Sequence, residues 1–191
     1  KRKGYYLVEG RKIKKVPANA EIIWWERFLM DGRKYHGPFH TVCKAEDPAV
    51  ILYSGGTTGT MKGILLSNLN FNALSQQIIA TNPMFRPGDK MLAVMPIFHG
   101  FGLGVCIHSM LANGGRCLLI PRFNPESYAK LLKKHKPNFI AGVPTLYEAL
   151  LRIKSLDRVD LSCLKGVFSG GDSLSIELKK RSDAFLKEPN A

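Results

Sequence analysis

Short, mostly apolar runs alternate with helical patterns along the chain from Asp47 onward. Their length and continuity are typical of strands covered on both faces. A regular alternation of strand and helix requires a parallel or mostly parallel sheet with right-handed crossovers. We therefore predict an α/β fold in which helices cover both faces of a mostly parallel sheet. The expected strands are residues 49–53, 64–66, 91–95, 116–120, 138–142 and 164–168.

Capping and breaking residues mark the limits of the predicted helices. Ser67 is a favourable N-cap for a helix that runs to about Ala80. Asn124 and Pro125 begin a helix that Pro137 ends, because proline suits the first helical position and breaks the interior. Further helices are expected over residues 22–29, 103–111, 144–151 and 175–185, and a turn between two short strands at residues 8–11.

Between the first two expected strands lies a loop rich in glycine, hydroxyls and lysine. Glycine lets the backbone approach a ligand closely, and successive N–H groups in such a turn form a concave anion site. Together with the hydroxyls and the positive charge of Lys62, this loop suits a polyphosphate; its alternative role is simply to join two strands. It is not a Walker loop, because Lys62 is followed by Gly63. The loop reads Ser54-Gly55-Gly56-Thr57-Thr58-Gly59-Thr60-Met61-Lys62-Gly63.

Two further loops follow strands of the predicted sheet. The first, residues 95–102, contains His99, and the second, residues 169–174, contains Gly170 and Gly171. Because open α/β sheets bind ligands beyond the carboxyl ends of their strands, we expect all three glycine loops at that edge. A neutral imidazole could donate a hydrogen bond to a carboxylate there. The plainer alternatives are a packed histidine and an ordinary strand-to-helix turn.

These loops resemble the motifs of the adenylate-forming enzymes, which include acyl-CoA synthetases, the adenylation domains of peptide synthetases, and luciferases. Residues 54–62 resemble the phosphate-loop signature, residues 95–102 the proline-aromatic-histidine loop, and residues 169–174 the Gly-Gly-x-x-Leu segment. Residues 142–145 match a loop that borders the acyl pocket, although a proline-started helix would look the same. The resemblance covers about residues 47–187. It departs from the family at Asp172-Ser173, where Ala-Pro is frequent.

The resemblance implies a role for each motif and a fold that is part of the family's large N-terminal domain. Lys62 and His99 are the expected catalytic residues. The acid is expected beside His99, Phe98, Gly142 and Val143. ATP and coenzyme A are the implied co-substrates, with Mg²⁺ held by a ligand outside this chain. The residues expected to bind ATP are Ser54, Gly55, Gly56, Thr57, Thr58, Gly59, Lys62, Gly170, Gly171 and Asp172.

On this resemblance we expect a fragment of an ATP-dependent acyl-CoA synthetase that adenylates a carboxylic acid and transfers the acyl group to coenzyme A. A fatty acid is the first choice, because Phe98, Phe101, Leu103, Val105 and Val143 suggest an apolar surround. The alternatives are an amino-acid or aryl-acid adenylation domain and a non-catalytic module that binds an anion or a membrane. The fragment is expected to be inactive in isolation, with its carboxyl-terminal domain absent.

Charge divides the chain unevenly. The 191 residues carry a net charge of +13, and residues 1–15 hold seven Lys and Arg against Glu9 alone. We expect a basic lead-in at residues 1–46 and an AMP-binding α/β subdomain at residues 47–191. The lead-in offers peripheral membrane contact, and nucleic acid is not an expected partner because no recognition motif accompanies the charge. Four scattered cysteines indicate reduced thiols and a cytoplasmic location.

Overall fold

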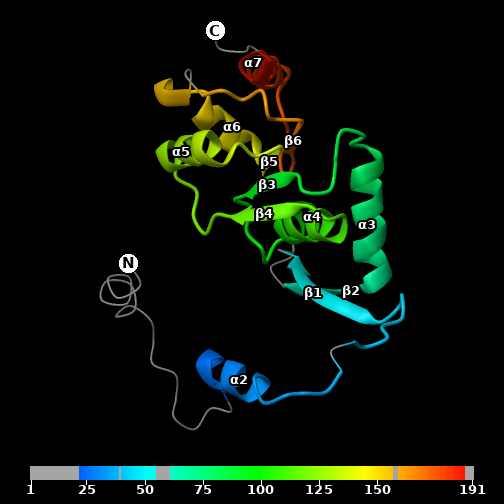
Figure 1. Cartoon of the computed structure of the whole chain (residues 1–191). Coiled ribbons are helices and arrows are strands. Elements are labelled where there is room, and N and C mark those ends of the chain that lie inside the picture. Colours follow the sequence, from blue (N-terminus) through cyan, green and yellow to red (C-terminus); the bar gives the residue numbers. More distant parts are fainter. Residues whose placement is uncertain (1–21, 39, 55–60, 157–158, 188–191) are drawn as a thin grey trace. The chain divides into compact units, whose positions relative to one another are not determined.

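The computed structural model describes residues 22–38, 40–54, 61–156 and 159–187 (Figure 1). The chain divides into two compact units, residues 1–42 and residues 43–191. The turn expected at residues 8–11 lies outside the described residues. The assignment of residues 1–46 as a basic lead-in to an AMP-binding subdomain stays a prediction. No helix in the described ranges is long and apolar enough to cross a membrane.

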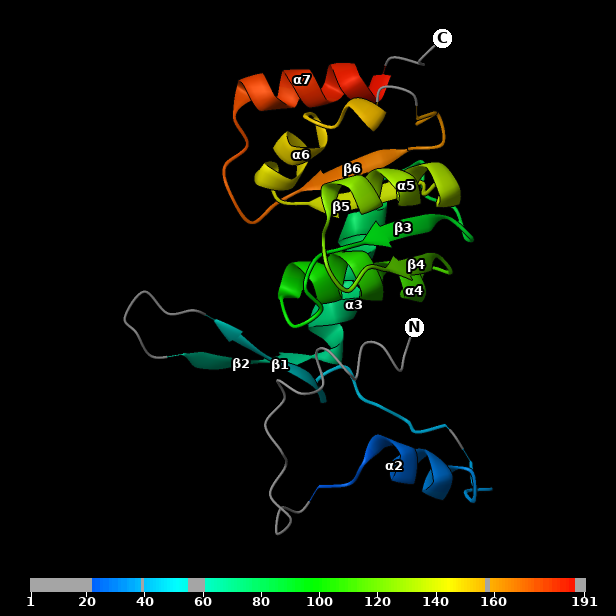
Figure 2. The same ribbon diagram turned by 90° about the vertical axis from the view of Figure 1, so that its left-hand side faces the viewer.

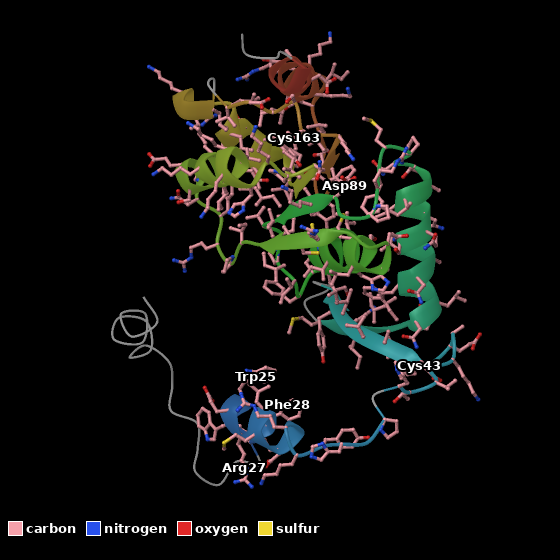
Figure 3. All side chains as sticks on the ribbon, in the orientation of Figure 1. Trp25, Arg27, Phe28, Cys43, Asp89 and Cys163 are labelled. Atoms are coloured by element: carbon pink, nitrogen blue, oxygen red, sulfur yellow. The ribbon has the colours of Figure 1, made fainter. Side chains whose placement is uncertain are left out.

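The first unit contains helix α2, Trp25–Gly32. It begins three residues later than the sequence predicts. Trp25 stacks on Phe28 with ring centroids 5.7 Å apart, and Arg27 pairs with Asp31 one turn along the helix. Trp25 and Phe28 leave one side of the helix and Arg27 leaves another (Figure 3), so α2 has the apolar face that its sequence predicts.

The second unit begins with a hairpin of strands β1, Pro48–Ser54, and β2, Lys62–Ser67. The two strands pair antiparallel in a sheet of their own. We predicted a buried first strand, and this was wrong: Ile51 is 55% exposed and Tyr53 is 68% exposed. The expectation that the loop after β1 follows a strand of the parallel sheet was also wrong. Two strands joined by so short a loop can pair only antiparallel, because parallel pairing needs a long crossover.

The remaining strands form the predicted parallel sheet. Its order is β4-β3-β5-β6, and every neighbouring pair is parallel. Each strand falls within two residues of its expected start, so the α/β prediction is confirmed. The strands are β3, Lys90–Ala93, β4, Arg116–Leu119, β5, Phe139–Gly142, and β6, Gly166–Ser169.

Helices cover both faces of this sheet, because alternate side chains of the central strands point to opposite sides. Leu92 and Ile140 pack in the core that α5 and α6 close. Met91, Ala93 and Phe139 pack in a second core with residues of η2 and α4, and Figures 1 and 2 show these helices on opposite sides. The helices are α3, Asn68–Ala80, η2, Phe101–His108, α4, Ser109–Ala112, α5, Pro125–His135, α6, Pro144–Leu150, η3, Lys154–Leu156, and α7, Ile176–Lys187.

Helix η2 differs from the ordinary helix that the sequence predicts over residues 103–111. It is a π-helix that starts at Phe101, and only its last turn, α4, is α-helical. A π-helix is wider than an α-helix and is rare outside functional sites. Its first turn is tightly packed: a Cβ atom at Gly102 would lie 2.1 Å from the carbonyl oxygen of Pro96.

Side chains tie the amino-terminal edge of the sheet together. Lys165 Nζ lies 2.8 Å and 2.9 Å from the two carboxylate oxygens of Asp89, which is largely buried (Figure 3). The Asn138 side chain accepts the N–H of Lys90 and donates to the carbonyl of Cys163. These bonds join the segments that enter β3, β5 and β6. They therefore fix these strands relative to one another, including the carboxyl ends from which the loops leave.

Candidate functional site

The hairpin brings the two ends of the glycine loop together. Ser54 and Lys62 are opposite each other in the β1–β2 register, so the loop leaves and returns at one point. Lys62 is exposed, and none of the described carboxylates pairs with it. Its charge is therefore available to an anion. The expected ligands Gly55, Gly56, Thr57, Thr58 and Gly59 lie outside the described residues.

Three hydrogen bonds between residues close in the sequence hold the loop around His99. The N–H of His99 donates to the Pro96 carbonyl at 3.1 Å, and the His99 carbonyl accepts the N–H of Leu103 at 2.9 Å. The ring is held as well, since Nδ1 accepts the backbone N–H of Phe101 at 3.1 Å. The His99 side chain is exposed, so a loop that fixes the imidazole still leaves it accessible to a ligand.

This loop touches the hairpin. A Cβ atom at Gly100 would lie 3.3 Å from Cδ1 of Leu52 on β1. Leu52 alternates with the exposed side chains of Ile51 and Tyr53, and it is half-buried. Strand β1, which leads into the glycine loop, therefore also packs against the histidine loop.

The two remaining loops meet at the ends of β5 and β6. Gly142 pairs with Ser169, and its carbonyl accepts the N–H of Gly170 at 3.2 Å. Gly171 has a φ of +82°, a conformation that glycine adopts without strain. A Cβ atom there would lie 3.4 Å from Cγ1 of Val143. The backbone at Gly171 thus lies next to Val143, the residue that precedes α6.

Asp172 follows Gly171 in the same loop. Its Oδ1 accepts the N–H of Ser173 at 2.7 Å, and the side chain is exposed. Behind the loop, the buried hydroxyl of Tyr147 donates to the carbonyl of Phe168 at the end of β6. Burial raises the pKa of Tyr147 far above its usual value, so this hydroxyl remains a donor at every physiological pH.

Phe101 connects the histidine loop to the Gly170 loop. The edge of its ring would lie 3.5 Å from a Cβ atom at Gly170. Sequence reasoning assigned Phe101 only to an apolar surround, and it gave Leu52 and Tyr147 no place near the site. Their long-range contacts leave no local signal, because the sequence pattern reports which face a residue takes but not which loop it meets.

Phe98, next to His99 in the chain, opens towards β4. It is 80% exposed and lines a hollow of about 570 Å³ between the ends of β3 and β4, on the far side of β3 from β5 and β6. Leu103 lines a different hollow beside α3, and Val105 lines a small gap in the core. Phe98, Leu103 and Val105 thus line three separate hollows, and the expectation that they surround the acid stays a prediction.

The described residues contain no group of three or more His, Cys, Asp or Glu side chains that could hold a metal ion.

The parallel sheet has a histidine loop and a glycine loop after its strands, and it lies beside a hairpin in which Lys62 is exposed and pairs with none of the described carboxylates. This arrangement is that of a domain of the adenylate-forming class. The family described as AMP-binding enzyme matches residues 8–190, and the chain belongs to that family.

Two of the relatives are CoA ligases named for different acids. The chain is 36% identical over 136 residues to a long-chain-fatty-acid–CoA ligase of Bacillus subtilis, with 71% of this chain and 24% of that protein covered. It is 33% identical over 151 residues to a probable 4-coumarate–CoA ligase 3 of Dictyostelium discoideum, with 78% and 27% covered. The chain thus spans about a quarter of the length of these curated relatives.

A solved structure supports the same assignment. ATP-bound MatB from Rhodopseudomonas palustris matches with a TM-score of 0.70 and 29% sequence identity, over 80% of this chain and 30% of that chain. The α/β fold of this chain is therefore that of the N-terminal domains of adenylate-forming enzymes.

Proposed function

We propose that the protein to which this chain belongs is an ATP-dependent acyl-CoA synthetase. The acid's carboxylate oxygen attacks the α-phosphorus of ATP, which gives acyl-AMP and releases pyrophosphate. The thiol sulfur of coenzyme A then attacks the acyl carbon, and AMP leaves. The observation that supports this proposal is the set of contacts Leu52–Gly100, Phe101–Gly170 and Val143–Gly171, because they join strand β1, the histidine loop, the Gly170 loop and the start of α6.

In this proposal each loop has one task. The hairpin loop and Lys62 hold the β- and γ-phosphates and neutralise charge as pyrophosphate departs. The backbone at Gly170 and Gly171, which has no side chains in the way, receives the adenine. His99 donates a hydrogen bond to the acid's carboxylate. Catalysis is then largely the positioning of two anions in line for displacement.

A fatty acid is the substrate we propose first. The family relatives include both fatty-acid and coumarate ligases, so an aryl acid is the second candidate. The hollow of about 570 Å³ lined by Phe98 and Phe123 favours an apolar or aromatic tail of either kind beside the histidine loop. We propose a cytoplasmic location.

The test is acid-dependent exchange of labelled pyrophosphate into ATP by the full-length protein. Exchange should require a carboxylic acid, with fatty and aryl acids compared side by side. Lys62→Ala should lower the exchange rate about 100-fold, as the loss of one charge-stabilising donor does in other enzymes. Lys130→Ala is the matched control, since Lys130 is an exposed lysine on α5.

Two results would contradict the proposal. Exchange that proceeds without any acid would exclude an acyl-adenylating enzyme. A protein that performs no exchange, but binds anionic vesicles or polyanions equally well with and without Lys62, would instead favour a non-catalytic anion-binding module.

A further inference from the structure

Phe101 occupies the junction of two loops that the proposed function assigns to different substrates. Its backbone N–H contacts His99, and its ring contacts Gly170. We infer that Phe101 is a positioning residue that fixes the protonation of His99 and couples the acid side of the site to the nucleotide side. The link to substrates rests on the proposed function, whereas the effect on His99 does not.

The hydrogen bond to His99 determines which ring nitrogen carries the proton. A backbone N–H can only donate, so Nδ1 of His99 must offer its lone pair at 3.1 Å. The neutral ring then carries its proton on Nε2. A carboxylate accepts hydrogen bonds only, so a histidine meant to hold the acid must present N–H at the accessible nitrogen. The Phe101 amide selects this tautomer before the acid arrives.

The amide is free for this task because of where it lies. Phe101 is the first residue of η2, and the first N–H groups of a helix have no acceptor within the helix. The turn is also rigid: the absence of a side chain at Gly102 lets its backbone pack against Pro96, whose carbonyl accepts the N–H of His99. A loop with this little freedom holds donor and ring in register.

The ring of Phe101 supplies the second half of the coupling. It is partly buried against the core that includes Ala93, Cys106 and Phe139. From there its edge reaches the backbone of Gly170, 3.5 Å from the place of a Cβ atom. A movement of the Gly170 loop on nucleotide binding is therefore transmitted to Phe101, and from its backbone to His99.

The direct test is nitrogen NMR of the full-length protein with ¹⁵N-labelled histidine, in which the His99 signals are assigned by their loss in His99→Gln. We expect Nε2 protonated and Nδ1 unprotonated in the neutral ring. Phe101→Ala retains the amide and should keep this pattern. Phe101→Pro removes the amide, which no hydrogen bond within the helix uses, and should shift the ring towards a mixture of tautomers. A proton on Nδ1 in the unmodified protein overturns the inference.

Kinetics test the coupling with the same pair of variants. Both lack the ring, so both should raise KM for ATP. Compared with Phe101→Ala, Phe101→Pro should raise KM for the acid by about a further tenfold, for the loss of one oriented hydrogen bond. Equal acid KM values in the two variants would contradict the role of the amide.

His99 itself offers a second comparison, which does not depend on how Phe101→Pro folds. Gln places an N–H near the position of Nε2, whereas Asn reaches only the position of Nδ1. We expect His99→Gln to retain about tenfold more exchange than His99→Asn. The reverse order would overturn the inference. A protein without any exchange would refute the proposed enzyme, but its NMR spectrum would still decide the tautomer.

Discussion

Gly102 is a residue at which the structure leaves no room for any side chain. A Cβ atom there would meet the Pro96 carbonyl oxygen at 2.1 Å and the Met95 oxygen at 2.8 Å, and backbone atoms cannot move aside as a side chain end can. Gly100, two residues earlier, is different, because its nearest neighbour is the flexible end of Leu52 at 3.3 Å. Only one of these two glycines is required by sterics.

We therefore expect Gly102→Ala to destabilise the protein by about 2 kcal/mol or more, as overpacking of a rigid region does. Gly100→Ala should change the free energy of unfolding by well under half of that. Urea unfolding of the two variants, followed by circular dichroism, provides the comparison. Equal stabilities would show that the turn between Pro96 and Gly102 is not closed in the way described.

At the scale of single elements, helix α3 shows how local sequence sets a boundary. Ser67 Oγ accepts the N–H of Asn70, and Asn70 Oδ1 accepts the N–H of Ser67 at 2.9 Å. Two N–H groups that a helix start leaves without partners are satisfied reciprocally. The cap also separates strand β2 from the helix, so it fixes where the hairpin ends.

Removing this cap has a predictable effect. Ser67→Ala should lower the free energy of unfolding by about 1 kcal/mol, and Asn70→Ala by a similar amount. The double variant should lose less than the sum, because the two side chains also share the hydrogen bond from Ser67 Oγ to Asn70 Oδ1, which either single change already removes. Gln77→Ala, at an exposed position of the same helix, should be nearly neutral. Strict additivity in the denaturation free energies would argue against a reciprocal cap.

The sequence predicted the elements better than their partners. Ser67, Asn124 and Pro125 start helices where expected, because caps are local chemistry. The run Met91-Leu92-Ala93 reveals a buried strand, because burial on both faces removes polar residues. The exposed hairpin was missed, since an apolar run is the same whether it is covered or not. The π-helical turn at Phe101 was missed because no composition rule distinguishes it from an α-helix.

The same limit applies to the candidate site. Glycine and histidine motifs identified the loops at residues 95–102 and 169–174, which the structure brings together through Phe101 and Gly170. The motifs did not predict that Phe98 lines a hollow between the ends of β3 and β4, because the sequence does not show on which side of β3 a loop residue projects.

For the molecule as a whole, the exposure of the cysteine thiols shows which parts of the fold are accessible to solvent. Cys43 is exposed and Cys106 is fully buried. Burial raises the pKa of the Cys106 thiol to about 12, and the neighbouring Cys117 adds to the shift. At pH 8 the reactive thiolate is then about one molecule in ten thousand at Cys106, even before access is considered.

Alkylation by iodoacetamide at pH 8 should accordingly modify Cys43 within minutes and leave Cys106 intact in the folded protein. Added urea should bring Cys106 into reaction together with the loss of circular dichroism, because it lies in the core between η2 and the sheet. Peptide mass spectrometry gives the order of modification. Rapid labelling of Cys106 in native buffer would show that this core opens locally.

The hairpin has a mechanical consequence of its own. No ladder hydrogen bond joins β1 and β2 to the four parallel strands, and Leu52 meets the histidine loop through side-chain packing alone. The hairpin that carries Lys62 is therefore held to the parallel sheet by side chains of β1 and by its packing on α3, so a shift of the hairpin as a unit would move Lys62 without breaking a ladder hydrogen bond of the four-stranded sheet.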